Sequence, residues 1–168
     1  VYNIVSKNYF TLKKEIFVTF DKYLVKEIKK LPQNTKKPLP TLILSGPNHT
    51  GKKAFSRLAW RKLSSTERSF YYFSLNSKQP KKYLQKFLKE HLSGDLLLLC
   101  QKHAITTYQD ILNSWLIKNP SSRLIIHFNS TNEIKSQVEN LSARENHFIN
   151  FSPLKKRNKD ILPLCEYF

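Results

Sequence analysis

One short segment of the chain has the residue types and the spacing of a phosphate-binding loop. Residues 46–53 read GPNHTGKK, a G-x-x-x-x-G-K pattern. The two glycines allow a tight turn whose backbone amides point at phosphate oxygens, and the lysine after the second glycine reaches the outer phosphates. The last residue stands where many such loops place a magnesium-binding hydroxyl. We predict a loop of nucleotide-binding origin, with a chance match as the alternative. The predicted contacts are Gly46, Pro47, Asn48, His49, Thr50, Gly51, Lys52 and Lys53.

Nucleotide hydrolysis needs more than this loop. In a hydrolysing site, a carboxylate at the end of a second buried strand holds magnesium, and a base beside it orients water. The apolar run 96–99 instead ends in Cys100 and Gln101, and Asp95 lies at its opposite end. A third apolar run ends before Asn129, which either senses a γ-phosphate or satisfies backbone groups in a turn. We predict no catalytic residue, no metal site and a doubtful role for magnesium.

Strand and helix patterns alternate along the chain. Apolar runs typical of strands occupy residues 41–45, 70–75, 95–100, 123–128 and 147–151. Helical spacing covers residues 12–31, 52–63, 80–92, 107–118, 132–141 and 158–168, with Pro80 expected at the first helical position. Buried strands joined by helices indicate an α/β fold with a parallel sheet covered on both faces. The Pro-rich loop at 32–40 closes a helical preface, residues 1–40, before an α/β core, residues 41–168.

Composition excludes several classes of protein. The chain has 168 residues and 40% hydrophobic side chains, enough for one domain with its own core. Two cysteines rule out a disulfide framework or a Cys-rich zinc site, and the five histidines show no ligand spacing. No apolar run approaches the length of a membrane span and no signal peptide opens the chain, so we expect a cytoplasmic protein without a membrane partner. Because the chain begins at Val1 and contains no Met, we expect it to be a piece of a longer protein.

Positive charge is concentrated in the first half of the chain. The net charge is +17, and residues 1–93 carry 20 basic and 5 acidic side chains. A basic half suggests a polyanion partner such as nucleic acid. The alternative is that the lysines only solvate the outer faces of helices. The sequence leaves both interpretations open.

Several segments together resemble the AAA+ domain of sigma-54-dependent enhancer-binding transcriptional activators. Residues 152–164, SPLKKRNKDILPL, are similar to that family's P-P-L-R-E-R-x-x-D-I-x-x-L. Residues 123–129, RLIIHFN, are similar to its R-I-I-A-A-T-N, and residues 93–101, SGDLLLLCQ, lie where it has G-G-T-L-F-L-D-E. Residues 46–52 match its G-E-S-G-T-G-K loop. The resemblance implies a P-loop NTPase fold with a five-stranded parallel sheet flanked by helices and the lid subdomain largely absent. It also implies that Ile4–Val5 lies near the adenine.

Departures from the family pattern indicate a lost motor function. The family's G-A-F-T-G-A loop, which engages sigma-54, does not occur between residues 76 and 93. The acidic pair is replaced by Cys100-Gln101. In residues 137–144, where the family has its arginine fingers, only Arg144 is basic, and it is out of register by one. We therefore expect a degenerate AAA+ domain that binds ATP or ADP weakly, or not at all, without hydrolysing it.

The resemblance also implies a transcription regulator. DNA would then be bound through a domain outside these residues, with contact to RNA polymerase and homo-oligomerisation as further candidate interactions. Without the G-A-F-T-G-A loop, we do not expect sigma-54 as a partner. Two alternatives come from other classes: an active P-loop ATPase or kinase with an acidic magnesium ligand elsewhere, such as Asp110, and a nucleic-acid-binding module that uses residues 1–93 directly.

Overall fold

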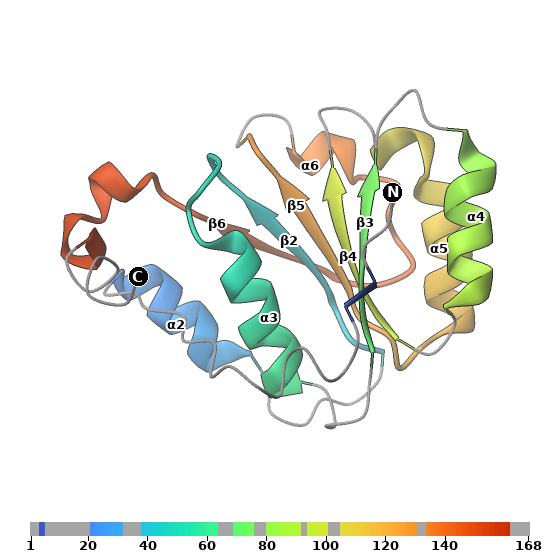
Figure 1. Ribbon diagram of the computed structural model, residues 1–168, viewed down its shortest axis with the longest axis horizontal. Helices are drawn as coiled ribbons and strands as arrows, with labels where there is room; N and C mark the ends of the chain where they lie inside the picture. Colours follow the sequence, from blue (N-terminus) through green and yellow to red (C-terminus); the bar gives the residue numbers. More distant parts are fainter. Residues whose placement is uncertain are drawn as a thin grey trace.

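Among the residues described, five parallel strands and one antiparallel edge strand form a single sheet in the order β1-β3-β4-β5-β2-β6 (Figure 1). The computed structural model describes residues 4–5, 21–31, 38–63, 69–75, 80–91, 94–100, 105–130 and 134–161. The strands are β1 (Ile4–Val5), β2 (Thr41–Ser45), β3 (Phe70–Leu75), β4 (Asp95–Cys100), β5 (Leu124–Phe128) and β6 (Asn146–Asn150). The helices are α2 (Lys22–Lys30), α3 (Lys52–Leu63), α4 (Lys81–Glu90), α5 (Gln109–Lys118) and α6 (Ile134–Gln137), with 3-10 turns η1 (Ile105–Thr107) and η2 (Leu154–Lys156).

The centre of the sheet is buried on both faces. Strand β2 pairs in parallel with β5 on one side and β6 on the other, and every residue of β2 and β5 is buried. Continuous apolar strands of this kind need helices on both faces of the sheet. Because β2 to β6 all run in parallel, their carboxyl ends meet at one edge, the upper edge in Figure 1.

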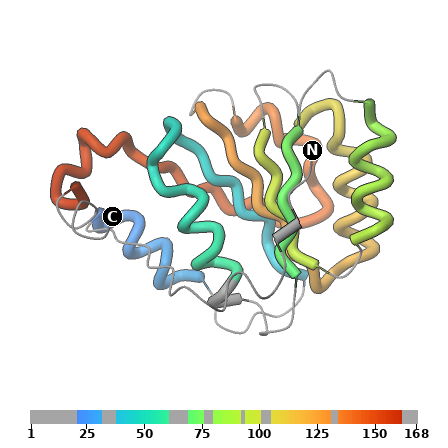
Figure 2. The backbone as a smooth tube through the Cα atoms, in the orientation of Figure 1, coloured from blue at the N-terminus to red at the C-terminus, as the bar shows by residue number. Residues whose placement is uncertain are grey.

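Successive strand residues face opposite sides, so the sheet separates two cores. The first, which we call the α3 core, includes Leu24, Leu44, Phe55, Leu97, Ile125 and Ile149. The second, which we call the α5 core, includes Ile43, Phe87, Leu98, Leu112, Ile126 and Val138. Figure 2 shows α2, α3 and residues 151–161 on one side of the sheet and α4 and α5 on the other.

Helix α2 is fastened to strand β6. At its start, the Asp21 carboxylate accepts hydrogen bonds from the amides of Tyr23 and Leu24, at 2.9 and 3.2 Å, which caps the helix. Further along, Glu27 is buried and accepts a hydrogen bond from Lys30 (2.7 Å), while its second oxygen lies 2.8 Å from Nε2 of His147. Burial raises the pKa of Glu27, but the bonds to Lys30 and His147 outweigh burial and leave the pKa below its ordinary value.

The predicted strands at 41–45, 70–75 and 95–100 have the same bounds in the structure. Pro80 was expected at the first helical position, but its ψ of 134° is extended, so it is the cap that precedes α4. The helix expected over 132–141 is confined to Ile134–Gln137, after which residues 138–140 form a turn. The two residues of β1 were missed because so short a strand has no detectable periodicity. The rest of the predicted N- and C-terminal helices, at 12–20 and 162–168, lies outside the described residues. In the part of the chain that the structure describes, no helix has the length and apolar character to cross a membrane.

Candidate phosphate-binding site

The predicted loop joins β2 to α3 at the carboxyl edge of the sheet. Gly46 and Gly51 have φ angles of 136° and 87°, which L side chains rarely adopt. A Cβ atom at Gly46 would also lie 2.3 Å from the carbonyl oxygen of Phe151. His49 is exposed and has a φ of 59°, an uncommon angle for a residue with a side chain. Both glycines of the pattern therefore stand where the backbone requires them.

The ammonium group of Lys52 is folded back into the loop. Its Nζ donates to the carbonyl oxygens of Gly46 (2.8 Å) and Pro47 (2.5 Å), and lies 3.3 Å from the Thr50 hydroxyl oxygen. Thr50 in turn donates its hydroxyl proton to the Pro47 carbonyl at 2.9 Å. Lys52 is only 6% exposed, and burial lowers its pKa to about 8. The loop is thus tied together around one cationic side chain.

A buried serine and a buried histidine form hydrogen bonds next to the first turn of α3. The hydroxyl of Ser56 lies 2.9 Å from the Lys52 carbonyl oxygen and 2.5 Å from Nε2 of His127 in β5. Burial, together with the charges of Lys52 and Lys53, lowers the pKa of His127 to about 3, so its ring is neutral at neutral pH. If Ser56 gives its one proton to the carbonyl, the ring must donate from Nε2. Sequence reasoning missed His127, since it stands in the middle of an apolar run.

The sheet register shows which residue of β4 faces the loop. Leu99 is paired with His127, and its half-buried side chain packs against the α3 core. Cys100, one of the two residues to which we assigned the lost acidic pair, faces the other way and is buried in the α5 core, where burial raises the pKa of its thiol. Because side chains alternate along a strand, the Cys100 half of that assignment was wrong, and Leu99 is the residue of β4 on the α3 face. Gln101 lies outside the described residues. The position of β4 that faces the loop is therefore apolar.

Of the other residues predicted to contact nucleotide or magnesium, one lies beside the loop and the rest lie away from it. Asn129 is exposed directly after Phe128, which pairs with Ser45 at the start of the loop, so it stands beside the loop at the same sheet edge. Strand Ile4–Val5 pairs with β3 at the far edge of the sheet and is separated from β2 by three strands, so its backbone is not brought to the loop. Asp110 is exposed in the first turn of α5, on the opposite face of the sheet from α3.

Two buried charged residues hold the backbone in place. Arg144, the only basic residue of the expected finger stretch, is 7% exposed. Its guanidinium donates to four backbone carbonyls, those of Leu39, Leu116, Asn119 and Ser122. Asp95 is buried at the far end of β4 and accepts a hydrogen bond from the Arg123 amide at 2.7 Å. Arg144 therefore serves this chain's own fold, and Asp95 is far from the loop, as its place in the sequence predicted.

The site fits a phosphate group better than a metal ion. A phosphate at the loop would meet the amino end of α3 and the Lys52 ammonium, which would exchange the carbonyls of Gly46 and Pro47 for phosphate oxygens. Magnesium prefers carboxylate and hydroxyl oxygens, whereas the positions that would supply them hold Leu99 and Lys53. Among the residues that the structure describes, no three His, Cys, Asp or Glu side chains cluster to hold a metal ion.

Comparisons with known proteins identify the fold. No protein-family model matches the chain, and no curated protein matches its sequence significantly. Among solved structures, NtrX from Brucella abortus in complex with ADP superposes with a TM-score of 0.67 at 15% identity, over 94% of this chain and 42% of that chain. The DnaC helicase loader superposes with a TM-score of 0.54 at 12% identity, over 87% of this chain and 99% of that chain. This chain therefore spans less than half of the NtrX chain. These likenesses, together with the parallel sheet and the loop after β2, show that the chain has the α/β fold of the AAA+ P-loop NTPases, as predicted.

Proposed function

We propose that this domain binds an adenine nucleotide at residues 46–53 and does not hydrolyse it. The observation that carries the proposal is the contrast between Lys52, held inside an intact loop, and Leu99, an apolar side chain on the neighbouring part of the sheet that faces the loop. The first supplies charge for phosphates, and the second cannot hold magnesium or activate water. The ADP complex of NtrX, which has a similar fold, supports the choice of an adenine nucleotide.

Binding of this kind should depend little on magnesium. In an intact site the metal is bound by a hydroxyl at the end of the loop and by a carboxylate on the facing strand. Here the loop ends in Lys53, whose exposed ammonium lies 5.6 Å from the centre of the Tyr72 ring. A second cation near the phosphates would offset part of the charge that magnesium normally neutralises.

The biological role that we propose is regulatory. The resemblance of residues 152–164 and 46–52 to sigma-54-dependent activators favours a transcription regulator whose AAA+ domain has lost its motor function. DNA would be bound by a domain outside these residues, and the nucleotide would act as a signal or a structural ligand. Contact with sigma-54 is not part of the proposal, because residues 80–91 are taken up by Pro80, α4 and its cap.

Calorimetry with ADP tests the binding. We expect wild-type protein to bind ADP with similar affinity in magnesium and in EDTA. Lys52→Ala should weaken binding about 30-fold, because it removes charge-assisted hydrogen bonds to the phosphates. The matched control is Lys118→Ala, which removes one exposed positive charge at the end of α5, on the other face of the sheet, and should leave the affinity within about twofold. Equal weakening by both variants would mean that ADP binds only through the general positive charge, and the proposal would be wrong.

A further inference from the structure

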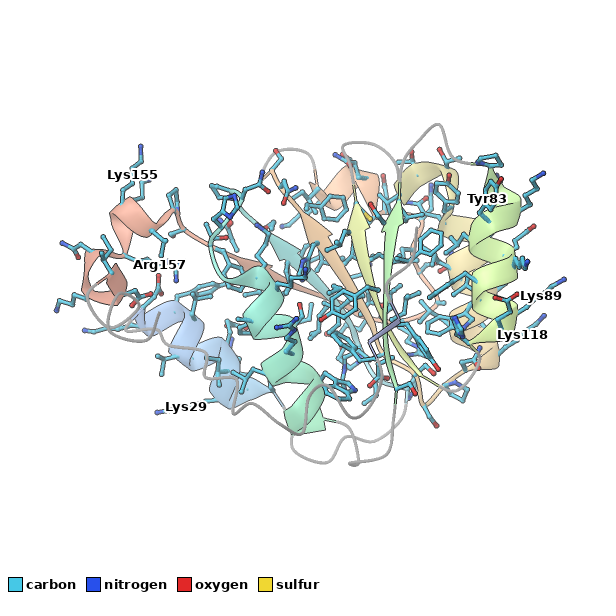
Figure 3. The ribbon with its side chains drawn as sticks, viewed as in Figure 1. Lys29, Tyr83, Lys89, Lys118, Lys155 and Arg157 are labelled. Atoms are coloured by element: carbon cyan, nitrogen blue, oxygen red, sulfur yellow. The ribbon has the colours of Figure 1, made fainter. Side chains whose placement is uncertain are left out.

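The segment that follows β6 carries a motif for which the proposed function gives no role. Residues 152–164 resemble the family most specifically, yet the predicted phosphate contacts, residues 46–53, include none of them. In the structure, the described part of this segment, residues 152–161, contacts the loop through Arg157. Figure 3 shows Arg157 within it, while Lys155 points away from the body of the molecule.

The Arg157 guanidinium is buried and makes three directed contacts. It donates to the Thr50 carbonyl oxygen from Nη2 (2.8 Å), to the Asp160 carboxylate from Nη1 (2.9 Å) and to the Ser152 carbonyl oxygen from Nε (3.0 Å). The side chains of Arg157 and Asp160 are 3% and 1% exposed. One planar side chain thus joins the phosphate loop, a carboxylate and the exit from β6.

Thr50 connects this contact to the phosphate-binding lysine. While its carbonyl accepts from Arg157, its hydroxyl donates to the Pro47 carbonyl, which also accepts from Lys52. A displacement of Thr50 would therefore change the position of Lys52. The loop is held at its other end as well, because the Phe151 amide donates to Ser45 (2.7 Å) just before Gly46.

A buried ion pair is costly unless its geometry is well satisfied, and it contributes little to stability relative to apolar side chains. This ion pair instead fixes the position of the loop. The Arg157 guanidinium joins residues that are 107 apart in sequence, and it holds Thr50 in a single orientation. Only arginine supplies donors in a planar fork that reaches three acceptors at once, so lysine is not an equivalent substitute.

We propose that Arg157 is a positioning residue for the phosphate loop, held in place by Asp160, and that it couples occupancy of the loop to the segment 152–161. Only the coupling to loop occupancy rests on the proposed nucleotide binding; the positioning role does not. Coupling is reciprocal: if the Arg157 contact favours the loop shape that binds phosphate, then bound phosphate must favour the contact and order the segment.

The test combines hydrogen exchange with calorimetry on the whole chain, with ADP as the probe. In Arg157→Lys we expect amides of the loop to exchange at least about fivefold faster without nucleotide, while those of β3 and β4 keep their rates. The affinity for ADP should fall about tenfold, the size expected for one charged hydrogen bond. In wild-type protein, ADP should slow exchange in residues 152–161, and Arg157→Lys should remove most of that protection.

Arg144→Lys is the matched control. It makes the same exchange at another buried arginine, whose carbonyl acceptors lie outside the loop, so ADP affinity should stay within about twofold. Asp160→Asn should reproduce part of the Arg157→Lys effect, and the double variant should add little, because both residues act through one contact.

The outcomes separate the two proposals. Faster loop exchange in Arg157→Lys, with Arg144→Lys unchanged, supports the positioning role even if wild-type protein binds no ADP. That result would overturn the proposed function and the coupling to loop occupancy, but not the positioning role. If loop exchange and ADP affinity in Arg157→Lys equal those of wild type, the positioning role is wrong. Equal loss of ADP affinity in Arg144→Lys would also overturn it, because a general loss of stability would then explain both variants.

Discussion

The end of β2 and the end of β4 lie at the same edge of one sheet, but they have opposite chemistry. After β2, Lys52 donates hydrogen bonds to two carbonyl oxygens of the loop, and the polar pair of Ser56 and His127 lies beside it. At the end of β4, Leu99 and Cys100 are apolar on both faces of the sheet. Phosphate binding and water activation depend on these two places separately, so one can persist without the other.

The largest expected change in the free energy of unfolding comes from placing a carboxylate on one face of β4 or the other. Cys100→Asp would place a carboxylate in the α5 core, with a cost of about 4 kcal/mol in the free energy of unfolding. Leu99→Asp puts the same group on the half-buried loop face, where we expect about 1–2 kcal/mol. Urea unfolding of both variants at pH 7 measures the difference. If Leu99→Asp is the more damaging of the two, our assignment of Leu99 to the loop face is wrong.

The polar support of the loop should make the protein sensitive to acid. The pKa of His127 is about 3 in the folded chain against 6.5 for the ordinary group, so between these values the unfolded state binds more protons. Stability therefore falls as the pH falls through this window, by about 2 kcal/mol between pH 7 and pH 5.

His127→Gln is the variant that isolates this effect, since its amide can replace the Nε2 donor to Ser56 without titrating. Unfolding free energies of this variant should change little between pH 7 and pH 5. Glu27 also contributes, but its pKa is lowered, so its contribution is lost only at more acidic pH. Parallel pH profiles for wild type and His127→Gln would contradict the assignment of the acid sensitivity to His127.

A smaller effect should appear at alkaline pH on the loop itself. Burial lowers the pKa of Lys52 to about 8, so most of the free protein carries a neutral Lys52 at pH 9. Phosphate oxygens favour the charged form, and ADP binding at pH 9 should therefore take up most of one proton. Calorimetry in two buffers of different ionisation enthalpy measures the uptake. It should vanish at pH 6.5 and in Lys52→Ala, and persistence in that variant would point to another group.

The sequence predicted the elements better than it predicted the contacts between them. The apolar runs of β2, β3 and β4 and the loop pattern are made of residues that are neighbours in the sequence, so they can be recognised there. The predicted bounds of these three strands agree with the structure. The support of the loop depends on pairs far apart in the chain: Ser56 with His127, and Thr50 with Arg157. No local pattern identifies such pairs, because each partner also suits an ordinary strand or turn.

The misplaced carboxylate position has a related cause. A run of four leucines shows that β4 is buried, but an apolar strand has no alternation to tell which residues face α3. The pairing of Leu99 with His127 and the two separate cores show that Leu99 lies on the α3 face and that Cys100 faces away. The expectation for Ile4–Val5 came from the family resemblance alone, and the pairing of β1 with β3 places its backbone at the far edge of the sheet.

The central claim is that the loop binds nucleotide while the neighbouring strand cannot support hydrolysis, and one measurement tests both halves. Purified protein is dialysed to equilibrium against radiolabelled ATP with magnesium, and the nucleotide bound in the protein compartment is quantified and identified over several hours. We expect bound nucleotide that is lost in Lys52→Ala and is recovered as intact ATP. Recovery of bound ADP at a rate that depends on Lys52 would contradict the account, because it would show hydrolysis at this site.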